Sequence, residues 1–337
     1  MNAVEMPDQL QLTKALSTFR SECLSLLESL QNADGGWGFH SGEQSRVEPT
    51  SWAVRALHNP EQGFKAGQLH KAADFLHSKQ LANGSWPAAA GMNSGTWVTS
   101  LTCAALAADE KSAANVTAGL KWLCDDLPRD SSPWRRFVRR MRSESHISEQ
   151  NDSYRGWGWT PRTSSWVEPT AFALMALRDA PVEQLPRNAS TRRDLAVALL
   201  YDRMCPGGGW NCGNPRVYGV DGDALVLPTC WALLALRGSE RAARKKDVPE
   251  KPGRALSLAW LQKEFAKIES AASLAVARMT LENYGIQPPR AKRDLHDWTA
   301  RELAEQGTHV LAWACMAVNP ARHWPLVAAK LAEGGAQ

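Results

Sequence analysis

Six short segments of the chain are rich in small and apolar residues and follow one common pattern. They are VEPTSWAVRAL (47–57), WVTSLTCAAL (97–106), VEPTAFALMAL (167–177), VLPTCWALLAL (226–236), SAASLAVARM (270–279) and GTHVLAWACM (307–316). Each opens near a Thr or Ser, often with Pro before it, which is typical of a helix capped by a hydroxyl group. Alanine on several faces lets such a helix pack closely on both sides. The pattern therefore predicts six buried helices.

Segments with ordinary amphipathic spacing separate these copies, at residues 10–30, 67–79, 111–124, 189–202, 254–266 and 292–305. Their apolar positions recur as on one face of a helix. No stretch shows the alternation of a strand. The two sets alternate six times, which predicts an all-α fold, an (α/α)6 toroid with the small-residue helices as its inner ring. We expect residues 1–337 to form a single domain, with a basic inserted linker at about 129–150.

Loops rich in Gly and Trp lie between several of the predicted helices. They are LQNADGGWGF (30–39), KQLANGSWPA (79–88), YRGWGWTP (154–161) and CPGGGWNCG (205–213). Glycine supplies backbone conformations closed to other residues, and tryptophan supplies a large flat body to pack over the next helix pair. These loops are expected to hold neighbouring pairs together.

The first two loops carry a specific resemblance. Gln31 with Gly36-Trp37, and Gln80 with Gly84 and Trp86, resemble the QW repeats of the squalene–hopene and oxidosqualene cyclases. The EPTSWAVRAL-type segments resemble that family and the β subunits of protein prenyltransferases. The resemblance covers nearly the whole chain and weakens after about residue 240. It implies the toroid fold strongly and a particular chemistry only weakly.

Bulk composition excludes several classes of protein. A net charge of +4 is too small to indicate a nucleic-acid partner, and with 44% hydrophobic residues and a mean hydropathy of −0.38 the chain is typical of soluble proteins. No apolar run approaches the roughly 18 residues of a membrane span. The amino terminus lacks a signal-peptide pattern, so we expect a cytoplasmic protein. The seven cysteines are expected to be thiols.

The resemblance also implies a catalytic acid. Cyclases that start by protonation carry an Asp-x-Asp-Asp-Thr-Ala segment, and alignment on Thr170-Ala171 places Glu168 at the position of the protonating Asp. Burial in an apolar cavity would raise its pKa toward that of a general acid. Two features depart from the family pattern, because Glu is one methylene longer than Asp and Pro169 replaces the adjoining Asp. Since Glu48 repeats the same Glu-Pro-Thr triplet, stabilisation of a helix amino terminus is the alternative interpretation.

Other residues are candidates for acid or metal chemistry. Asp221 and Asp223 lead into an inner helix as a second acid pair or a metal site, although Asp-Gly is often only a turn. The zinc set of the prenyltransferases is matched only by Cys230 and His309, which lie on inner helices too far apart for metal bonds of about 2 Å. We expect a buried thiol and a satisfied or solvent-facing imidazole there. No cofactor is predicted, and zinc or magnesium is left open.

Aromatic residues and a basic stretch complete the candidate site. Trp52, Trp97, Phe172, Trp231 and Trp313 lie in the first two turns of the inner helices and are expected to line a central cavity that suits an isoprenoid chain. In the basic linker, Arg135 and Arg136 stand beside apolar residues. They are a solvated surface, a contact to an anionic membrane surface, or ligands of a diphosphate group.

Three functions fit these features. The first is a terpenoid-cyclase-like protein that binds a linear isoprenoid and cyclises it by protonation. The second is a prenyltransferase-like enzyme acting on a prenyl diphosphate. The third is a non-catalytic toroid that binds a lipid or a protein partner.

Overall fold

The computed structural model describes residues 5–58, 67–129, 134, 137, 141, 150–237 and 253–319. This part of the chain is predominantly helical. The amphipathic segments form α1 (Glu5–Ser29), α3 (Gly67–Ser78), α5 (Ala113–Asp125), α8 (Ala189–Asp202), α11 (Arg254–Phe265) and α13 (Ala300–Gln306). The small-residue segments form α2 (Val47–Leu57), α4 (Val98–Leu106), α7 (Val167–Asp179), α9 (Val226–Leu236), α12 (Ala271–Asn283) and α14 (Thr308–Ala317).

Short elements complete the description. Three single-turn 3-10 helices, Glu110–Ser112 (η1), Val182–Gln184 (η4) and Leu295–Asp297 (η5), precede or connect helices. Strands β1 (Arg216–Val217) and β2 (Val220–Asp221) form an antiparallel hairpin with Val217 opposite Val220. The sequence gives no sign of this hairpin, because two-residue strands are too short for an alternating pattern.

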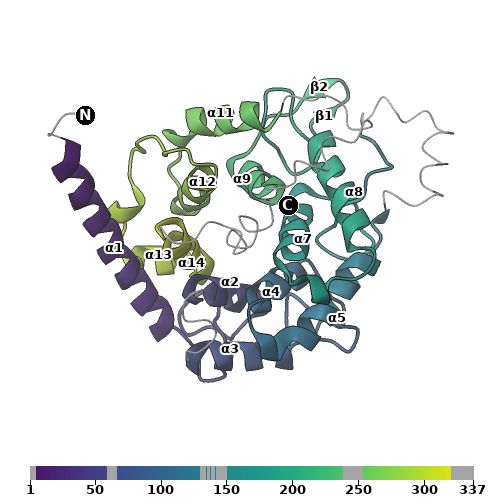
Figure 1. The fold of residues 1–337 in the computed structure, drawn as a ribbon, viewed down its shortest axis with the longest axis horizontal. Coiled ribbons are helices and arrows are strands. Elements are labelled where there is room, and N and C mark those ends of the chain that lie inside the picture. Colours follow the sequence, from purple (N-terminus) through teal and green to yellow (C-terminus); the bar gives the residue numbers. More distant parts are fainter. Residues whose placement is uncertain are drawn as a thin grey trace, which may run out of the picture.

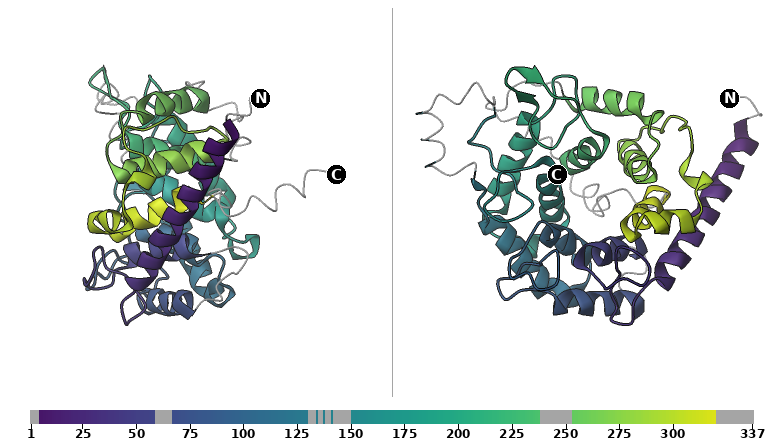
Figure 2. Two further views of the ribbon diagram at one scale, coloured as in Figure 1. Left: turned by 90° about the vertical axis from the view of Figure 1, so that its left-hand side faces the viewer. Right: turned by 180° about the vertical axis from the view of Figure 1, so that it is seen from behind.

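The small-residue helices contact one another in a closed order. α2 packs against α4, α4 against α7, α7 against α9, α9 against α12, α12 against α14, and α14 against α2. The small-residue helices also pack against amphipathic helices: α2 against α3, α4 against α5, α7 against α8, α9 against α11, α12 against α11, and α14 against α13 and α1. Figure 1 shows the six small-residue helices around a common axis with the amphipathic helices outside them, and Figure 2 shows the same arrangement from behind.

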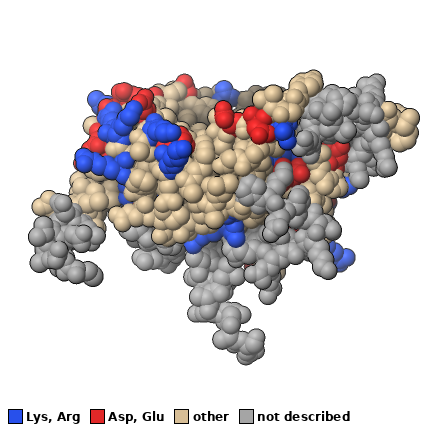
Figure 3. Space-filling model, turned by 90° about the horizontal axis from the view of Figure 1, so that it is seen from above, with Lys and Arg blue, Asp and Glu red and all other residues tan. Residues whose placement is uncertain are grey.

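One large cluster of buried apolar side chains draws on all of these small-residue helices. In α9, every residue from Pro228 to Leu236 is buried. A helix that is apolar all round requires neighbours on every side, and the two layers supply them. None of the helices in the described ranges is both long and apolar enough to cross a bilayer. Where charged side chains gather on the face in Figure 3, Lys and Arg lie beside Asp and Glu.

The Gly-Trp loops hold adjacent pairs together by a repeated set of hydrogen bonds. In four units the indole Nε1 of the loop tryptophan donates to a leucine carbonyl in the last turn of the preceding amphipathic helix, at 2.6–2.8 Å: Trp37 to Leu27, Trp86 to Leu76, Trp157 to Leu123 and Trp210 to Leu200. The backbone N–H of the same tryptophan donates to a threonine hydroxyl of the following small-residue helix, at 2.8–3.0 Å: Thr50, Thr99, Thr170 and Thr229.

The prediction that these threonines cap their own helices is therefore wrong. Arg46, Trp166 and Leu225 occupy the N-cap positions of α2, α7 and α9 without a side-chain capping bond. The tryptophan N–H is buried, and a buried donor without an acceptor costs free energy. The threonine hydroxyl therefore accepts from this N–H and does not cap its own helix. Hydroxyl capping does hold for α12, where Ser270 Oγ accepts from the backbone N–H of Ser273.

The glutamines of the QW-like loops also join neighbouring units, through hydrogen bonds from their side-chain amides. Gln31 Nε2 donates to the carbonyls of Gly35 and Gln68, at 2.8 and 2.9 Å, and so joins its loop to the first turn of α3. Gln80 repeats this bond pair with Gly84 and Asn115. Gly35 has φ +86, and a Cβ there would lie 2.3 Å from the Lys71 carbonyl oxygen. Only glycine permits this close approach.

Candidate functional site

The amino-terminal ends of the small-residue helices lie beside loops of neighbouring units. The backbone N–H of Trp97 donates to the carbonyl of Trp159, that of Val167 to Cys212, and that of Thr308 to Phe39, at 2.7–3.1 Å. In each case the acceptor stands two residues after a loop tryptophan, so the bonds repeat around the axis. We call this end of the helix ring the amino-terminal mouth. The bond between Thr308 and Phe39 joins the last pair to the first.

The five aromatic residues predicted to act together do meet near the axis. Trp52 contacts Phe172, Trp231 and Trp313 with ring centroids 6.0, 5.6 and 5.4 Å apart. Phe172 lies 5.1 Å from Trp231 and 5.2 Å from Trp97. Trp52 and Trp231 stand on α2 and α9, which lie three places apart in the order of helix contacts, so the rings meet across the axis. We call these five residues the aromatic cluster.

The rings of the aromatic cluster pack against one another. Trp52 is fully buried, and Trp231, Phe172 and Trp313 are 1%, 6% and 8% exposed. Centroid separations near 5–6 Å are those of direct aromatic contact. The predicted residues are thus brought together, and whether they line a cavity stays a prediction.

Two glutamates stand one turn closer to the mouth than two members of the aromatic cluster. Glu48 precedes Trp52 by four residues on α2, and Glu168 precedes Phe172 by four residues on α7. Residues four apart share a helix face. Because Trp52 and Phe172 meet near the axis, both glutamates lie on the axis-facing side of the mouth.

Burial changes the acidity of both carboxyl groups. It raises the pKa of Glu48 from its ordinary value of 4.5 to about 7, and it also raises the pKa of Glu168. Desolvation is the cause in both cases, since a half-buried carboxylate loses hydration. The sequence singles out Glu168 by its resemblance to the cyclase acid, but the structure gives Glu48 the same placement. The motif alone does not reveal that the two glutamates are equivalent. That equivalence follows from the burial of the first turns of both α2 and α7.

The second acid pair lies in a different environment. Asp221 is in strand β2, where its carboxylate pairs with Arg216 at 3.2 Å and its side chain is 54% exposed. Asp223 is also exposed. Water therefore solvates both carboxylates. Their proposed role as acid or metal ligand stays a prediction.

The remaining predicted residues are placed as follows. Cys230 is fully buried, and burial raises the pKa of its thiol to about 12, as expected of a packed thiol. His309 lies in the first turn of α14, half-buried, with its ring 5.0 Å from Trp313 and 6.4 Å from Phe39. The sequence predicts a satisfied or solvent-facing imidazole, yet His309 Nδ1 is buried with no hydrogen-bond partner among the described residues. Arg135 and Arg136 lie outside the described residues.

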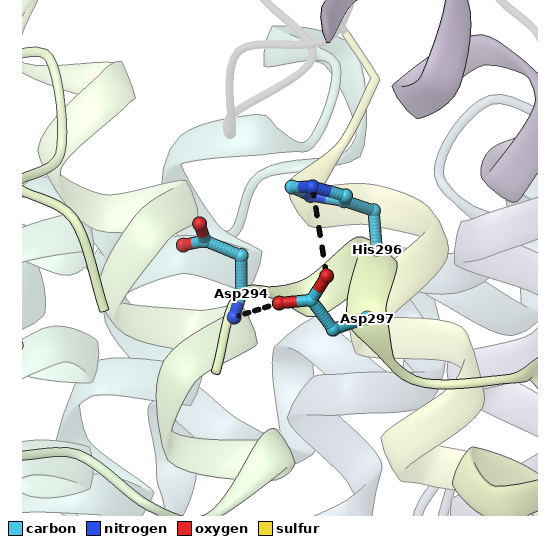
Figure 4. A group of neighbouring side chains, drawn as sticks. All are labelled: Asp294, His296 and Asp297. Atoms are coloured by element: carbon cyan, nitrogen blue, oxygen red, sulfur yellow. Dashed lines mark hydrogen bonds and ion pairs between the residues drawn. The ribbon is translucent and has the colours of Figure 1, made fainter. Parts of the chain in front are cut away.

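One group of side chains in the described ranges has the geometry of a possible metal site. Donor atoms of Asp294, His296 and Asp297 lie within 4.8 Å of one another (Figure 4). Asp294 and His296 also line an open groove of about 990 Å³ beside α1. The two aspartates form a reciprocal capping box around η5, which accounts for both carboxylates without a metal. The group precedes the outer helix α13 and belongs to no axis-facing turn.

Comparisons with known proteins place the chain beside terpenoid-related proteins. No family model matches it. It is 25% identical over 243 residues to a drimenyl diphosphate synthase from Streptomyces showdoensis, covering 61% of this chain and 44% of that protein. It is 36% identical over 75 residues to a drimenyl diphosphate synthase from Streptantibioticus cattleyicolor, covering 22% and 14%. The chain thus spans less than half the length of these relatives.

A solved structure supports the fold alone. The crystal structure of a protein from Actinoplanes matches with a TM-score of 0.55 at 15% identity, over 90% of this chain and 98% of that one. In sequence, the chain is weakly similar to two drimenyl diphosphate synthases.

Proposed function

We propose that this chain is an (α/α)6 toroid of the terpenoid-cyclase type that binds a linear isoprenoid and starts its cyclisation by protonation. The observation that carries the proposal is the placement of two half-buried carboxyl groups, Glu48 and Glu168, one turn from an axial aromatic cluster. The closed order of helix contacts supports the toroid. The names of the two curated relatives make a prenyl diphosphate the favoured substrate class.

In this proposal Glu168 is the initiating acid. Burial raises the pKa of Glu168 and so favours the protonated carboxyl group, which transfers its proton to an alkene that lies against it. Transfer forms a C–H bond at one alkene carbon and leaves a carbocation at the other, which the next double bond attacks to close a ring. Loss of a proton from carbon ends the sequence, so the reaction is an isomerisation and needs no oxidant or reductant.

The aromatic cluster has the complementary role. The π-faces of Trp52, Phe172 and Trp231 stabilise developing positive charge without acting as nucleophiles. Because these rings touch one another, a bound isoprenoid replaces ring–ring contacts with ring–chain contacts. Arg135 and Arg136 remain the sequence-based candidates for holding the diphosphate.

Substitution of the acids tests the proposal. With geranyl, farnesyl and geranylgeranyl diphosphate as probes, Glu168→Gln should lower turnover by roughly 10²–10⁴, the usual contribution of a general acid. Glu48→Gln and the double variant show whether the second carboxyl shares the role. The pair Asp221→Asn and Asp223→Asn is the matched control on exposed acids. If only that pair lost activity, the initiating acid would lie there and Glu168 would be structural.

The alternatives give different results with the same protein. Tight binding of a probe without any conversion favours the non-catalytic lipid-binding toroid. Zinc at one equivalent per chain, together with transfer of the prenyl group to a second molecule, favours the prenyltransferase-like reaction. Either result would replace the cyclase proposal.

A further inference from the structure

The reaction proposed above ends with the loss of a proton, and it therefore needs a base as well as an acid. We propose that His309 is this base and removes the proton from the final carbocation. The inference rests on the proposed function and adds a residue to it. The sequence alone predicts no catalytic role for His309, only a satisfied or solvent-facing imidazole.

The position of His309 is fixed by its contacts along α14. Its ring lies 5.0 Å from that of Trp313, which stands four residues later on the same helix face. Trp313 in turn lies 5.4 Å from both Trp52 and Trp231. His309 therefore lies at the edge of the aromatic cluster, toward the mouth. Because α14 packs against α2, it is one helix away from Glu48.

The imidazole is available to accept a proton. Its Nδ1 is buried and has no hydrogen-bond partner among the described residues. Burial, with a smaller contribution from His40, lowers the pKa of His309 below its ordinary value of 6.5. The ring is therefore neutral near pH 7, and a neutral imidazole nitrogen beside a carbocation is a base.

The proton transfer is balanced. An imidazole nitrogen takes the proton from a carbon next to the cationic centre, and the two electrons of that C–H bond form the new double bond. His309 becomes an imidazolium ion and later returns the proton to water, so one proton enters from Glu168 and one leaves. Without a base the carbocation persists until water adds to it, which yields an alcohol.

The test compares products as well as rates. His309→Phe keeps an aromatic ring but removes the base, and His309→Asn is the second variant in case phenylalanine disturbs folding. His70→Gln, on the outer helix α3, is the matched control. With the prenyl diphosphate that the wild type converts, both His309 variants should lose roughly 10²-fold in turnover to the alkene, and the remaining product should contain an added hydroxyl group. Probe affinity, measured by quenching of tryptophan fluorescence, should change little.

The outcomes distinguish a failure of the proposed role of His309 from a failure of the proposed cyclase function. If both His309 variants form the wild-type alkene at the wild-type rate, His309 is not the base and the cyclase proposal stands. Equal losses of probe affinity and turnover would show that His309 only shapes the binding site, and would overturn the inference. A wild type that forms no cyclic product would overturn both.

Discussion

The carboxyl groups of Glu48 and Glu168 lie half-buried in the first turns of α2 and α7, and burial raises the pKa of each. The identical Val-Glu-Pro-Thr sequences around them produce the same local structure. The sequence marks Glu168 as a candidate acid through its resemblance to a family motif. It could not show that Glu48 is equally placed, because burial depends on the neighbouring helices and loops.

The raised pKa of Glu48 makes a prediction about stability and pH. A folded-state pKa of about 7 against an ordinary 4.5 means that folding favours the protonated carboxyl. The contribution of the protonated Glu48 carboxyl to the free energy of unfolding is fully present below about pH 4.5 and is lost as the pH rises through about 7. The free energy of unfolding of the wild type relative to Glu48→Gln should therefore fall by about 3 kcal/mol across this range. Urea unfolding of both proteins at several pH values measures it, and parallel pH profiles would contradict it.

At the scale of elements, the repeat pattern predicted most of the helices closely. The predicted helix at 292–305 is an exception, because only the 3-10 turn η5 (Leu295–Asp297) and the short α13 (Ala300–Gln306) form there. α2 and α9 have the predicted bounds, and α3, α4 and α14 begin or end within one residue of them. Apolar periodicity fixes such elements because each helix must bury a defined face. The cap predicted for Thr170 is not formed, because its hydroxyl accepts from the N–H of Trp157 in a loop thirteen residues earlier. Local sequence favours a helix cap, and tertiary packing decides otherwise.

Removal of one such hydroxyl should weaken the fold measurably. Thr170→Val keeps the shape of the side chain but leaves the buried N–H of Trp157 without its acceptor, which costs about 1–3 kcal/mol. Thr191→Val, on the exposed surface of α8, is the matched control and should change stability by less than about 0.5 kcal/mol. Chemical denaturation measures both. Similar values for the two variants would show that the loop bonds add little.

At the scale of the whole molecule, the first and last helix pairs are joined directly. Thr308 donates its backbone N–H to the Phe39 carbonyl and its hydroxyl to the Gly38 carbonyl, each at 2.7 Å. The six-fold repeat in the sequence predicts a ring, but no local signal identifies which groups join its ends. His309 stands beside this junction, and for the same reason the sequence alone could not show its surroundings.

A substitution at the junction between the first and last helix pairs should also loosen the loop around Phe39, which is far away in sequence. Gly307 has φ +131, and a Cβ there would lie 2.7 Å from the ring of His309. Gly307→Ala should cost about 1–3 kcal/mol through backbone strain and should speed amide hydrogen exchange in the loop around Phe39. Gly219→Ala, at φ +78 with no atom within 4 Å, is the control for positive φ alone. Unchanged exchange around Phe39 would argue against a mechanically closed ring.

The central claim is that the chain cyclises a prenyl diphosphate by protonating it. The most direct measurement is mass spectrometry of the product formed by the wild type in D₂O. The account predicts an isomer of the substrate that retains its diphosphate and has gained one deuterium, because the proton of Glu168 exchanges with solvent before it is transferred. Release of pyrophosphate without deuterium uptake, or recovery of unchanged substrate after prolonged incubation, would contradict it.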